Sequence, residues 1–541
     1  MSSTPASSGA TIITTDHRGI PLHTIDNGGA PGSAAAEQIC TGTLSFAVGT
    51  QDEPMELLGV THLVEHMILG ALEHFPLPHG AVVDHESMQF HATGSPTDVA
   101  AYFEALAHTI SNFAQLSRRD FTLAKMIIKA ENPHAYTEFT SGMLTYRFGA
   151  QGPGLAHLHA PTLQALTHDE ATSWARTWLH TGHAALSFSA RPPAKLNVQL
   201  PSGTPLPRPT HVPTRQNPTL IASPLEGVAL SLLVPGSYAA LLAAALEYEL
   251  VQSLRTTDGL IYSVEQLIYP LRNVHVSAAP THPTGTVTRF ENSNAVDSFC
   301  HVDLVLDPLP ENTLPVLKAS VLEFRRIAEH GFSTNSIAFA RTVLAANLAF
   351  DEPRAASYLD HYTADHLAGR RRPERQSIGS HMLHTSLIDL SNQLTDVLAR
   401  ALPTVLVAYD DNAKVGPKKA AALGLERDNF SIWQRTPAQD GRTVTVFHLE
   451  GADEHVSWAH RSAKEKLTLT ATHLMKKKPN KTLFIDLATI RLVGVRECGC
   501  ICLIDELGRH TEIDTAEFKH AKSLRQSLLA SFQKHIIRAF P

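Results

Sequence analysis

The chain has 541 residues, too many for one compact core, and this length predicts about three or four domains. Hydrophobic residues make up 43% and charged residues 18%, which is typical of a globular protein and excludes a disordered chain. The formal net charge of -7 provides no basic excess to neutralise phosphates, so nucleic acid is not expected as a main partner.

The amino-terminal segment MSSTPASSGATIITT has neither a basic start nor an apolar centre, so it is not expected to be a signal peptide. The most apolar stretch, Tyr238 to Leu250, is too short and too charged to span a membrane. Only five cysteines occur, and this odd number argues against a disulfide framework. We therefore expect a cytoplasmic protein with no membrane span.

The first segment, residues 11–200, mixes strand and helix signals. We expect strands at Thr43–Val48 and Ala184–Ala190, and helices at Gly59–Gly70, Asp98–Phe113 and Phe121–Ala130. A proline-rich stretch follows, and its residues 201–218 are assigned to an extended linker.

The second segment, residues 219–435, repeats this style of alternating strands and helices. We expect strands at Val228–Val234, His301–Leu306 and Pro403–Ala408, and helices at Tyr238–Arg255 and Leu314–His330. Two segments of similar length and pattern suggest an internal duplication.

The last segment, residues 443–541, follows a turn-rich boundary at Arg435–Arg442 and has a different pattern. Short strands are expected at Leu467–Leu469, Thr482–Ile485, Ile490–Val495 and Cys500–Ile504, with a final helix at about Thr515–Phe540. This pattern suggests a small β-barrel with a terminal helix, and it resembles a pleckstrin-homology-like module. The predicted fold is therefore α+β, with two homologous α/β halves and a small C-terminal β-barrel-like domain.

The helix expected at Gly59–Gly70 carries the motif His62-Leu63-Val64-Glu65-His66. His62 and His66 lie one helical turn apart on the same face, so both imidazoles can reach one metal ion. Glu65 lies between them, close enough to act on water at the metal. A catalytic zinc needs three protein ligands and one open position, so a third ligand must come from elsewhere in the chain.

The stretch around this motif resembles the opening of the pitrilysin family, to which the mitochondrial processing peptidases also belong. The residues that match the family pattern in order are Gly49, Glu53, Gly59, His62, Glu65, His66 and Gly70. The resemblance covers about residues 12–430, and it implies halves in which an antiparallel sheet packs with helices. It also implies a zinc-dependent endopeptidase in which Glu65 is the catalytic base.

The resemblance implies that the third zinc ligand is a glutamate on a later helix. Met126-Ile127-Ile128-Lys129-Ala130-Glu131 matches the family sequence, so the role is carried onto Glu131. Glu138 is the alternative.

The segment Leu254 to Tyr262 resembles a family sequence in the second half, and its Arg255 and Tyr262 match in spacing. A guanidinium and a phenol can donate hydrogen bonds to a peptide carbonyl and to the oxyanion that forms on it. The resemblance therefore implies that Arg255 and Tyr262 hold the substrate.

The implied substrate is a peptide or precursor, bound as an extended strand beside an edge strand at Phe90–Thr93. Family relatives built from two such halves close as pairs, which implies a homodimer or a heterodimer with a paralogous subunit. The family also contains members that do not cleave peptides, so an inactive binding or scaffold subunit is the alternative function. A third interpretation makes the C-terminal module the functional centre, which recruits a partner.

Overall fold

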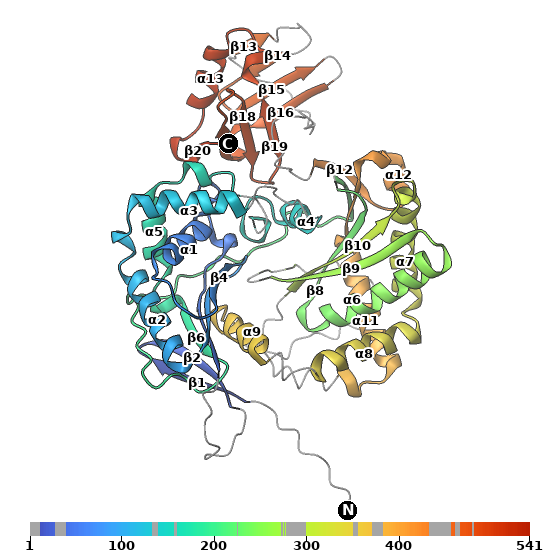
Figure 1. The fold of residues 1–541 in the computed structure, drawn as a ribbon. Helices are drawn as coiled ribbons and strands as arrows, with labels where there is room; N and C mark the ends of the chain where they lie inside the picture. The colour runs from blue at the N-terminus through green and yellow to red at the C-terminus, as the bar shows by residue number, and fades with distance from the viewer. Residues whose placement is uncertain are drawn as a thin grey trace, which may run out of the picture.

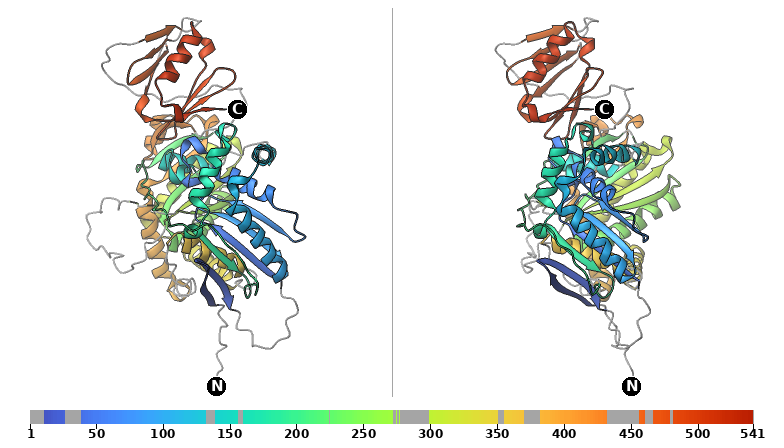
Figure 2. Two further views of the ribbon diagram at one scale, coloured as in Figure 1. Left: turned by 90° about the vertical axis from the view of Figure 1, so that its left-hand side faces the viewer. Right: turned by 60° about the vertical axis from the view of Figure 1, so that its left-hand side comes forward.

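The computed structural model describes residues 11–26, 39–131, 139–155, 160–223, 225–271, 274, 276, 299–349, 355–369, 382–431, 456–459, 466–478 and 481–540. Two α/β halves lie side by side, the first on the left of Figure 1 and the second on the right, with a smaller module above them. Turned views show the module at one end of the molecule (Figure 2). Each half contains a six-stranded sheet, and the module contains two four-stranded sheets.

The sheet of the first half has the strand order β1-β2-β6-β3-β5-β4. Its strands are β1 (Thr11–His17), β2 (Ile20–Asp26), β3 (Cys40–Phe46), β4 (His79–Val83), β5 (Met88–Gly94) and β6 (Ala184–Phe188). Neighbouring strands are antiparallel, except that β2 and β6 run parallel. The central strands β3 and β6 are buried almost throughout, as expected for strands covered on both faces.

The helices of the first half share one apolar core with this sheet. They are α1 (Val60–Ala71), α2 (Pro96–Ser111), α3 (Arg118–Glu131) and α5 (His168–Trp178). Local sequence determines where two of them begin. The Ser95 side chain accepts a hydrogen bond from the Asp98 N–H at the start of α2, and Thr167 and Glu170 form a capping box at α5.

The sheet of the second half has the order β12-β7-β11-β8-β10-β9. Its strands are β7 (Thr219–Ser223), β8 (Val228–Pro235), β9 (Ile261–Pro270), β10 (Phe299–Pro308), β11 (Leu406–Asp410) and β12 (Glu426–Ser431). The order β7-β11-β8-β10-β9 repeats β2-β6-β3-β5-β4, with the one parallel pair in the same place. The two homologous halves expected from the sequence are therefore confirmed.

The helices that share an apolar core with this sheet are α6 (Gly236–Leu250), α7 (Thr313–His330), α8 (Thr334–Ala349), α11 (Leu387–Ala401) and α12 (Pro417–Ala422). The helix predicted at Tyr238–Arg255 continues beyond α6 as a π-helix, Val251–Thr257. Its wider turn is seen where the Asp258 N–H donates to the Ser253 carbonyl, 3.2 Å away. This widening carries Arg255 out of the regular helix, just before β9.

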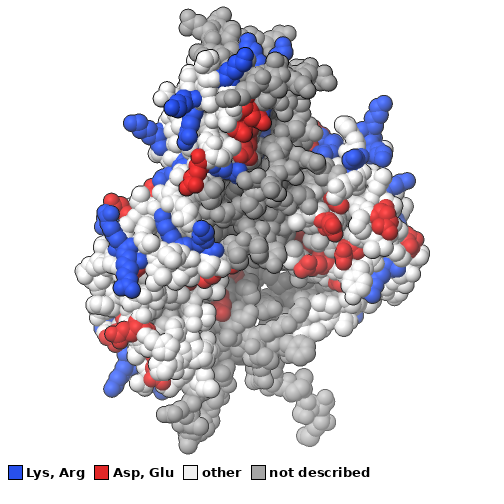
Figure 3. Space-filling view, turned by 45° about the horizontal axis from the view of Figure 1, so that its top comes forward, with Lys and Arg blue, Asp and Glu red and all other residues white. Residues whose placement is uncertain are grey.

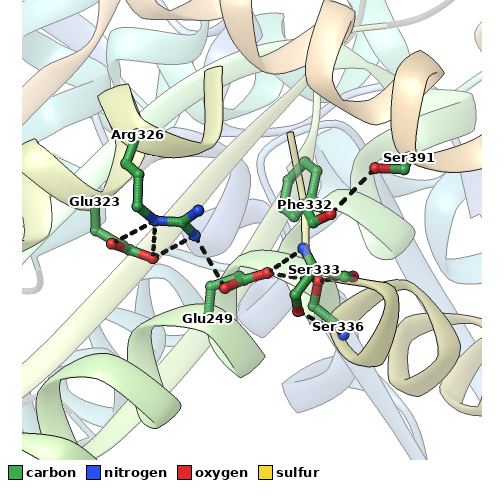
Figure 4. A network of polar contacts seen from close by, with 7 residues as sticks. All are labelled: Glu249, Glu323, Arg326, Phe332, Ser333, Ser336 and Ser391. Atoms are coloured by element: carbon green, nitrogen blue, oxygen red, sulfur yellow. Dashed lines mark hydrogen bonds and ion pairs between the residues drawn. The ribbon is translucent and has the colours of Figure 1, made fainter. Parts of the chain in front are cut away.

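A buried carboxylate ties three of these helices together (Figure 4). Glu249 of α6 accepts hydrogen bonds from the Ser333 N–H at 2.7 Å and the Ser336 hydroxyl at 2.8 Å, at the start of α8. Its other oxygen lies 3.1 Å from the Arg326 guanidinium of α7. A carboxylate at a helix N-terminus satisfies N–H groups that have no partner within the helix.

One helix of each half packs against the sheet of the other half. Helix α4 (Phe139–Phe148) of the first half packs Phe139, Met143 and Tyr146 against β7, β8 and β11. Helix α9 (Ala355–Leu367), which belongs to the second half, lies against β2, β3 and β6 of the first sheet (Figure 1). The exchange places a helix of the partner half on each sheet.

The docking of α4 buries a cationic side chain between the halves. Arg147 is 2% exposed and donates to the Ser231 carbonyl at 2.7 Å, the Thr404 carbonyl at 2.7 Å and His301 Nε2 at 3.2 Å. Burial lowers the pKa of Arg147 to about 10, so it stays charged at neutral pH. His301 Nδ1 lies 3.1 Å from Asp303 Oδ1, and this carboxylate balances the guanidinium.

The C-terminal module contains two separate sheets, so the closed barrel expected from the sequence is wrong for the residues that the structure describes. One sheet contains β13 (Val456–Ala459), β14 (Lys466–Leu469), β15 (His473–Lys478) and β16 (Lys481–Asp486); the other has the order β19 (His510–Ile513), β18 (Ile501–Asp505), β17 (Ile490–Val495) and β20 (Ile537–Ala539). No described ladder joins the sheets, and their apolar faces pack with α13 (Ala521–Ala530) instead.

The predicted final helix, Thr515–Phe540, is also too long. After α13 the chain returns as β20 beside β17, and the Phe540 N–H donates to the Val495 carbonyl at 3.0 Å. Gly494 permits this approach, because a Cβ there would lie 2.3 Å from the Phe540 ring.

The C-terminal module docks on the first half next to α1. Its Leu492, Cys502, Ile504 and Phe540 form one apolar cluster with Met55, Leu58, Ala150 and Leu155. Arg538 pairs with Glu170 at 2.7 Å on the rim of this contact. The module therefore supports the segment that leads into α1.

Residues 201–218 contain neither helix nor strand, apart from one isolated bridge at His211, as their prolines predict. The turn-rich boundary expected at Arg435–Arg442 lies outside the described residues. None of the described helices combines the length and the apolar character that a membrane crossing requires. On the face shown in Figure 3, side chains of both signs are scattered over the molecule, without a broad basic area among the residues described.

Candidate metal centre

Helix α1 begins at a glycine and is capped by a carboxylate. Gly59 has φ +91°, and a Cβ there would lie 2.3 Å from the Ala160 side chain, so both the conformation and the space require glycine. The buried Glu53 carboxylate accepts from the Gly59 N–H at 2.7 Å and the Thr61 N–H at 2.8 Å. These two bonds set the position of the first turn of α1.

The first turn of α1 is also held by side chains of α5 and of the loop before α5. The Trp174 indole N–H donates to the Thr61 hydroxyl at 3.1 Å, and the Thr162 hydroxyl donates to the Leu58 carbonyl at 2.8 Å. The apolar face of α1, with Leu63, Val64, Met67 and Ile68, is fully buried. The helix that carries the motif is therefore fixed along its whole length.

The polar face of α1 brings the three motif side chains together. The Nε2 atoms of His62 and His66 lie 3.0 Å apart. The Glu65 Oε2 atom lies 3.8 Å from His62 Nε2 and 3.5 Å from His66 Nε2. The two ring nitrogens therefore converge on one point, with the Glu65 carboxylate beside it.

Glu131, at the end of α3, completes the cluster. Helix α3 packs on α1 and buries Ala124 and Ile128, which directs its last residue toward the motif. The Glu131 Oε2 atom lies 3.1 Å from His66 Nε2 and 3.5 Å from His62 Nε2. The ligand atoms of His62, His66 and Glu131 all lie within 4.8 Å of one another, and no other such cluster is found among the described residues.

This donor set fits zinc. Two imidazoles and one carboxylate are typical of a catalytic zinc site. Two ligand atoms on a tetrahedral zinc lie roughly 3.3 Å apart when each bond is about 2.0–2.1 Å long, and the observed separations of 3.0, 3.1 and 3.5 Å lie around this value. The site is also open on one side, since the His62 side chain is 32% exposed.

Burial shifts the titration of this cluster. It lowers the pKa of His62 to about 4, and the nearby His66 adds to this effect. It raises the pKa of Glu65 to about 7, and the nearby Glu131 charge adds to this effect. At neutral pH the His62 imidazole is therefore uncharged, the form that binds metal.

Two residues near the cluster have roles that the sequence does not reveal. Tyr102 of α2 packs within reach of the Glu65 charge, and its hydroxyl is buried with no hydrogen-bond partner among the described residues. In the sequence it was only one of several apolar positions on a helix face. Glu53 was recognised as part of a pattern, but its capping role depends on a turn that only the structure displays.

Arg255 and Tyr262 lie near each other but are not joined to the cluster by any described contact. The Arg255 guanidinium carbon lies 5.7 Å from the centre of the Tyr262 ring. Tyr262 is 74% exposed at the start of β9, the edge strand of the second sheet. Glu138, the alternative ligand, lies outside the described residues.

The strand at Phe90–Thr93 is not the edge of the first sheet, as the sequence had suggested. It belongs to β5, and β4 covers it in an antiparallel pair that joins His79 to Ala92 and Val83 to Met88. The segment His79–Val83 is only five residues long and begins His-Gly, so the sequence shows no clear strand pattern there. β4 is therefore the edge strand on this side of the first sheet, and β1 is the edge strand on the other side.

Comparison with known proteins identifies a similar fold but assigns the chain to no family. No protein-family model matches the sequence, and no curated protein matches it. The solved structures give a clear similarity of fold. A chain of complex III from Candida albicans has 13% identity and a TM-score of 0.58, over 77% of this chain and 100% of the other.

Two further structures are similar at the same identity of 13%. An inactive domain of an M16 peptidase from Pseudomonas fluorescens has a TM-score of 0.55 over 73% of this chain and 97% of its own. A protease from Helicobacter pylori has a TM-score of 0.54 over 74% and 99%. The chain thus has an M16 peptidase-like fold, which occurs in a protease and in an inactive domain alike.

Proposed function

We propose that this protein is a zinc-dependent endopeptidase of the pitrilysin type. The observation that carries the proposal is the convergence of His62, His66 and Glu131 on one point, with the Glu65 carboxylate at its side. The M16 peptidase-like fold supports it, since a similar fold occurs in a solved protease.

When bound by His62, His66 and Glu131, zinc would supply a Lewis acid that polarises the peptide carbonyl and activates water. Glu65 takes a proton from the attacking water and passes it to the leaving amide nitrogen, so that one water molecule is consumed for each bond cleaved. Its position 3.5 to 3.8 Å from the two imidazole nitrogens leaves it beside the metal position rather than among the ligands.

The peptide substrate is proposed to bind as an extended strand. The free edge of β4 provides unpaired backbone groups for it, in place of the strand at Phe90–Thr93. Arg255, exposed in the π-helix before β9, and Tyr262, exposed at the start of β9, hold the substrate carbonyl. Since no described contact joins this pair to the metal cluster, we propose that a second chain, identical or paralogous, supplies it across a dimer.

The five cysteines all lie in the described residues, and none of them forms a disulfide. Free thiols persist in a reducing compartment, and this supports the proposed cytoplasmic location. A precursor or leader peptide is the proposed substrate class.

A non-catalytic binding subunit is the second candidate. The observation that favours it is the similar fold of an inactive M16 domain. The two candidates differ in peptide cleavage. An endopeptidase needs Glu65 to cleave peptides, whereas a scaffold subunit does not.

The test is cleavage of a defined peptide mixture by the purified protein and by its Glu65→Gln variant, with bound zinc measured in both. We expect zinc in both proteins and a loss of cleavage of at least about 100-fold in the variant, since general acid–base catalysis contributes about 10²–10⁴-fold. Glu56→Gln, in the loop before α1, is the matched control and should cleave normally. A metal-free protein, or equal cleavage by wild type and Glu65→Gln, would reject the endopeptidase proposal.

A further inference from the structure

Two of the five cysteines lie together in the turn that joins β17 to β18, in the module at the top of Figure 1. Cys498 is exposed and Cys500 is half-buried, whereas Cys40, Cys300 and Cys502 are buried. The Cys498 thiol lies within hydrogen-bonding distance of the Cys500 thiol. A reagent in solution can therefore reach one pair of neighbouring thiols in this chain.

Hydrogen bonds hold this turn in one conformation. The Arg496 N–H donates to the Cys500 carbonyl at 3.0 Å, and the Gly499 N–H donates to the Arg496 carbonyl at 2.9 Å. Gly499 has φ +91°, as in three-residue hairpin loops that end in a left-handed glycine. The Thr515 hydroxyl donates to the Gly499 carbonyl at 2.9 Å and ties the turn to the chain after β19. The fold therefore keeps the cysteines on either side of this glycine close together.

The thiol pair lacks the further ligands that a zinc ion needs. Structural zinc sites use four protein ligands, and catalytic zinc sites use three. No third ligand atom of a histidine, cysteine or carboxylate joins the pair in a metal-binding cluster among the residues that the structure describes. Disulfide chemistry, by contrast, needs only the two thiols and a second disulfide with which they exchange.

The two thiols differ in reactivity. Burial raises the pKa of Cys500 to about 12, and the neighbouring Cys498 thiol and the Asp514 carboxylate add to this effect. Because the thiolate is the form that attacks a disulfide, the exposed Cys498 reacts first. Cys500 reacts second, and a thiolate of high pKa is the stronger nucleophile once it forms.

We propose that Cys498 and Cys500 form a reversible disulfide by exchange with a low-molecular-weight disulfide such as oxidised glutathione. The Cys498 thiolate attacks one sulfur of the small disulfide, which leaves a mixed disulfide on Cys498 and releases one small thiol. The Cys500 thiolate then attacks the Cys498 sulfur, so that the bond between the two cysteines forms and the second small thiol leaves. The two cysteines lose two electrons and two protons, and the small disulfide gains them as two thiols.

The thiol pair is separate from the candidate metal centre. The cysteines belong to the C-terminal module, whereas the proposed metal ligands belong to α1 and α3 of the first half. None of the proposed metal ligands contributes a hydrogen bond to the turn. The proposal therefore does not depend on the peptidase function.

Mass spectrometry of the full-length protein tests the exchange. The reduced protein is incubated with oxidised glutathione at mildly alkaline pH, and the remaining thiols are alkylated. Trypsin then releases the peptide 497–509, which contains Cys498, Cys500 and Cys502. We expect this peptide to lose two hydrogens, with the new bond between Cys498 and Cys500, and dithiothreitol to reverse the change. Free thiols, two separate glutathione adducts, or a bond to Cys502 would overturn the proposal.

A matched pair of variants tests the roles of the two thiols. Cys500→Ser cannot complete the second step, so we expect at least about tenfold less internal disulfide and a stable glutathione adduct on Cys498. Cys502→Ser is the control, because Cys502 is also two residues from Cys500 but is buried against His510. This control should form the disulfide as the wild type does. Undiminished internal disulfide in Cys500→Ser would contradict the assignment.

Two further measurements test whether the fold builds this site. Unfolding in urea breaks the hydrogen bonds of the turn, so the yield of the bond between Cys498 and Cys500 should fall at least about threefold. Glu65→Gln changes the proposed peptidase site and should leave the yield unchanged. An equal yield in urea would show that the fold does not pair the thiols, and a lower yield in Glu65→Gln would contradict the independence of the two sites.

Discussion

Within one turn of α1 the motif side chains differ strongly in exposure, and this difference sets what each can do. The Glu65 side chain is 5% exposed, His66 12% and His62 32%. Glu131, from the other helix, is 45% exposed. The cluster is thus closed on the side of Glu65 and open on the side of His62 and Glu131, which is where a substrate would approach.

Substitution of Glu131 and of Glu138 should affect zinc affinity differently. Glu131→Gln removes a charged ligand, and we expect zinc affinity to fall by more than the roughly 10–100-fold cost of losing an outer-shell partner. Glu138→Gln should leave the affinity unchanged. Competition with a chromophoric chelator measures both, and a larger loss in Glu138→Gln would transfer the ligand role to that residue.

At the scale of elements, each half ties its equivalent helices together in a different way. In the first half, α1 and α3 meet at the candidate metal ligands. In the second half, α6 and α8 meet at Glu249 and the serines that begin α8 (Figure 4). The duplicated fold therefore keeps the packing of this helix pair while only one half presents a metal-binding cluster among the described residues.

The Glu53 cap predicts a coupling between helix stability and metal binding. Glu53→Gln keeps one oxygen acceptor but turns the second into an amide donor that faces an N–H. We expect the unfolding free energy to fall by about 1–2 kcal/mol and zinc affinity to fall as well, because the first turn of α1 loses its anchor.

Chemical denaturation and chelator competition measure the two effects, and Glu56→Gln is the control. Full stability together with full zinc affinity in Glu53→Gln would show that the cap does not position the helix.

Elements with a strong local pattern could be predicted from the sequence, and those that depend on distant contacts could not. Helix α1 was expected at Gly59–Gly70 and is found at Val60–Ala71, because its apolar spacing and its glycine start are local signals. Strand β4 could not be predicted, since it has only five residues, HGAVV, and as an edge strand it pairs with β5 alone. The contact of Glu131 with the histidines was expected from a family resemblance and not from spacing.

At the scale of the whole molecule, the exchanged helices α4 and α9 make the two halves interdependent. The Arg147 cluster includes a serine, a histidine and an aspartate in line, with Ser231 Oγ 2.7 Å from His301 Nε2. The side chains of this cluster are fully buried, so no substrate can reach them. The cluster instead joins the two halves, a contact called the lock below. Nothing in the sequence signals this lock, since Arg147 lies 154 residues from His301.

Breaking this lock should destabilise the whole protein. Arg147→Met leaves the Asp303 charge buried without compensation, and we expect a loss of about 3–5 kcal/mol of unfolding free energy. Adding Asp303→Asn should recover part of this loss, which a double-mutant cycle measures by denaturation. Purely additive effects of the two substitutions would contradict the coupling.

Anomalous X-ray scattering at the zinc absorption edge shows directly whether His62, His66 and Glu131 hold zinc at one point. In crystals of the protein grown with zinc, we expect an anomalous peak bonded to His62 Nε2, His66 Nε2 and a Glu131 carboxylate oxygen. A map with no peak between these three side chains, or with a fully occupied peak held by other residues, would contradict it.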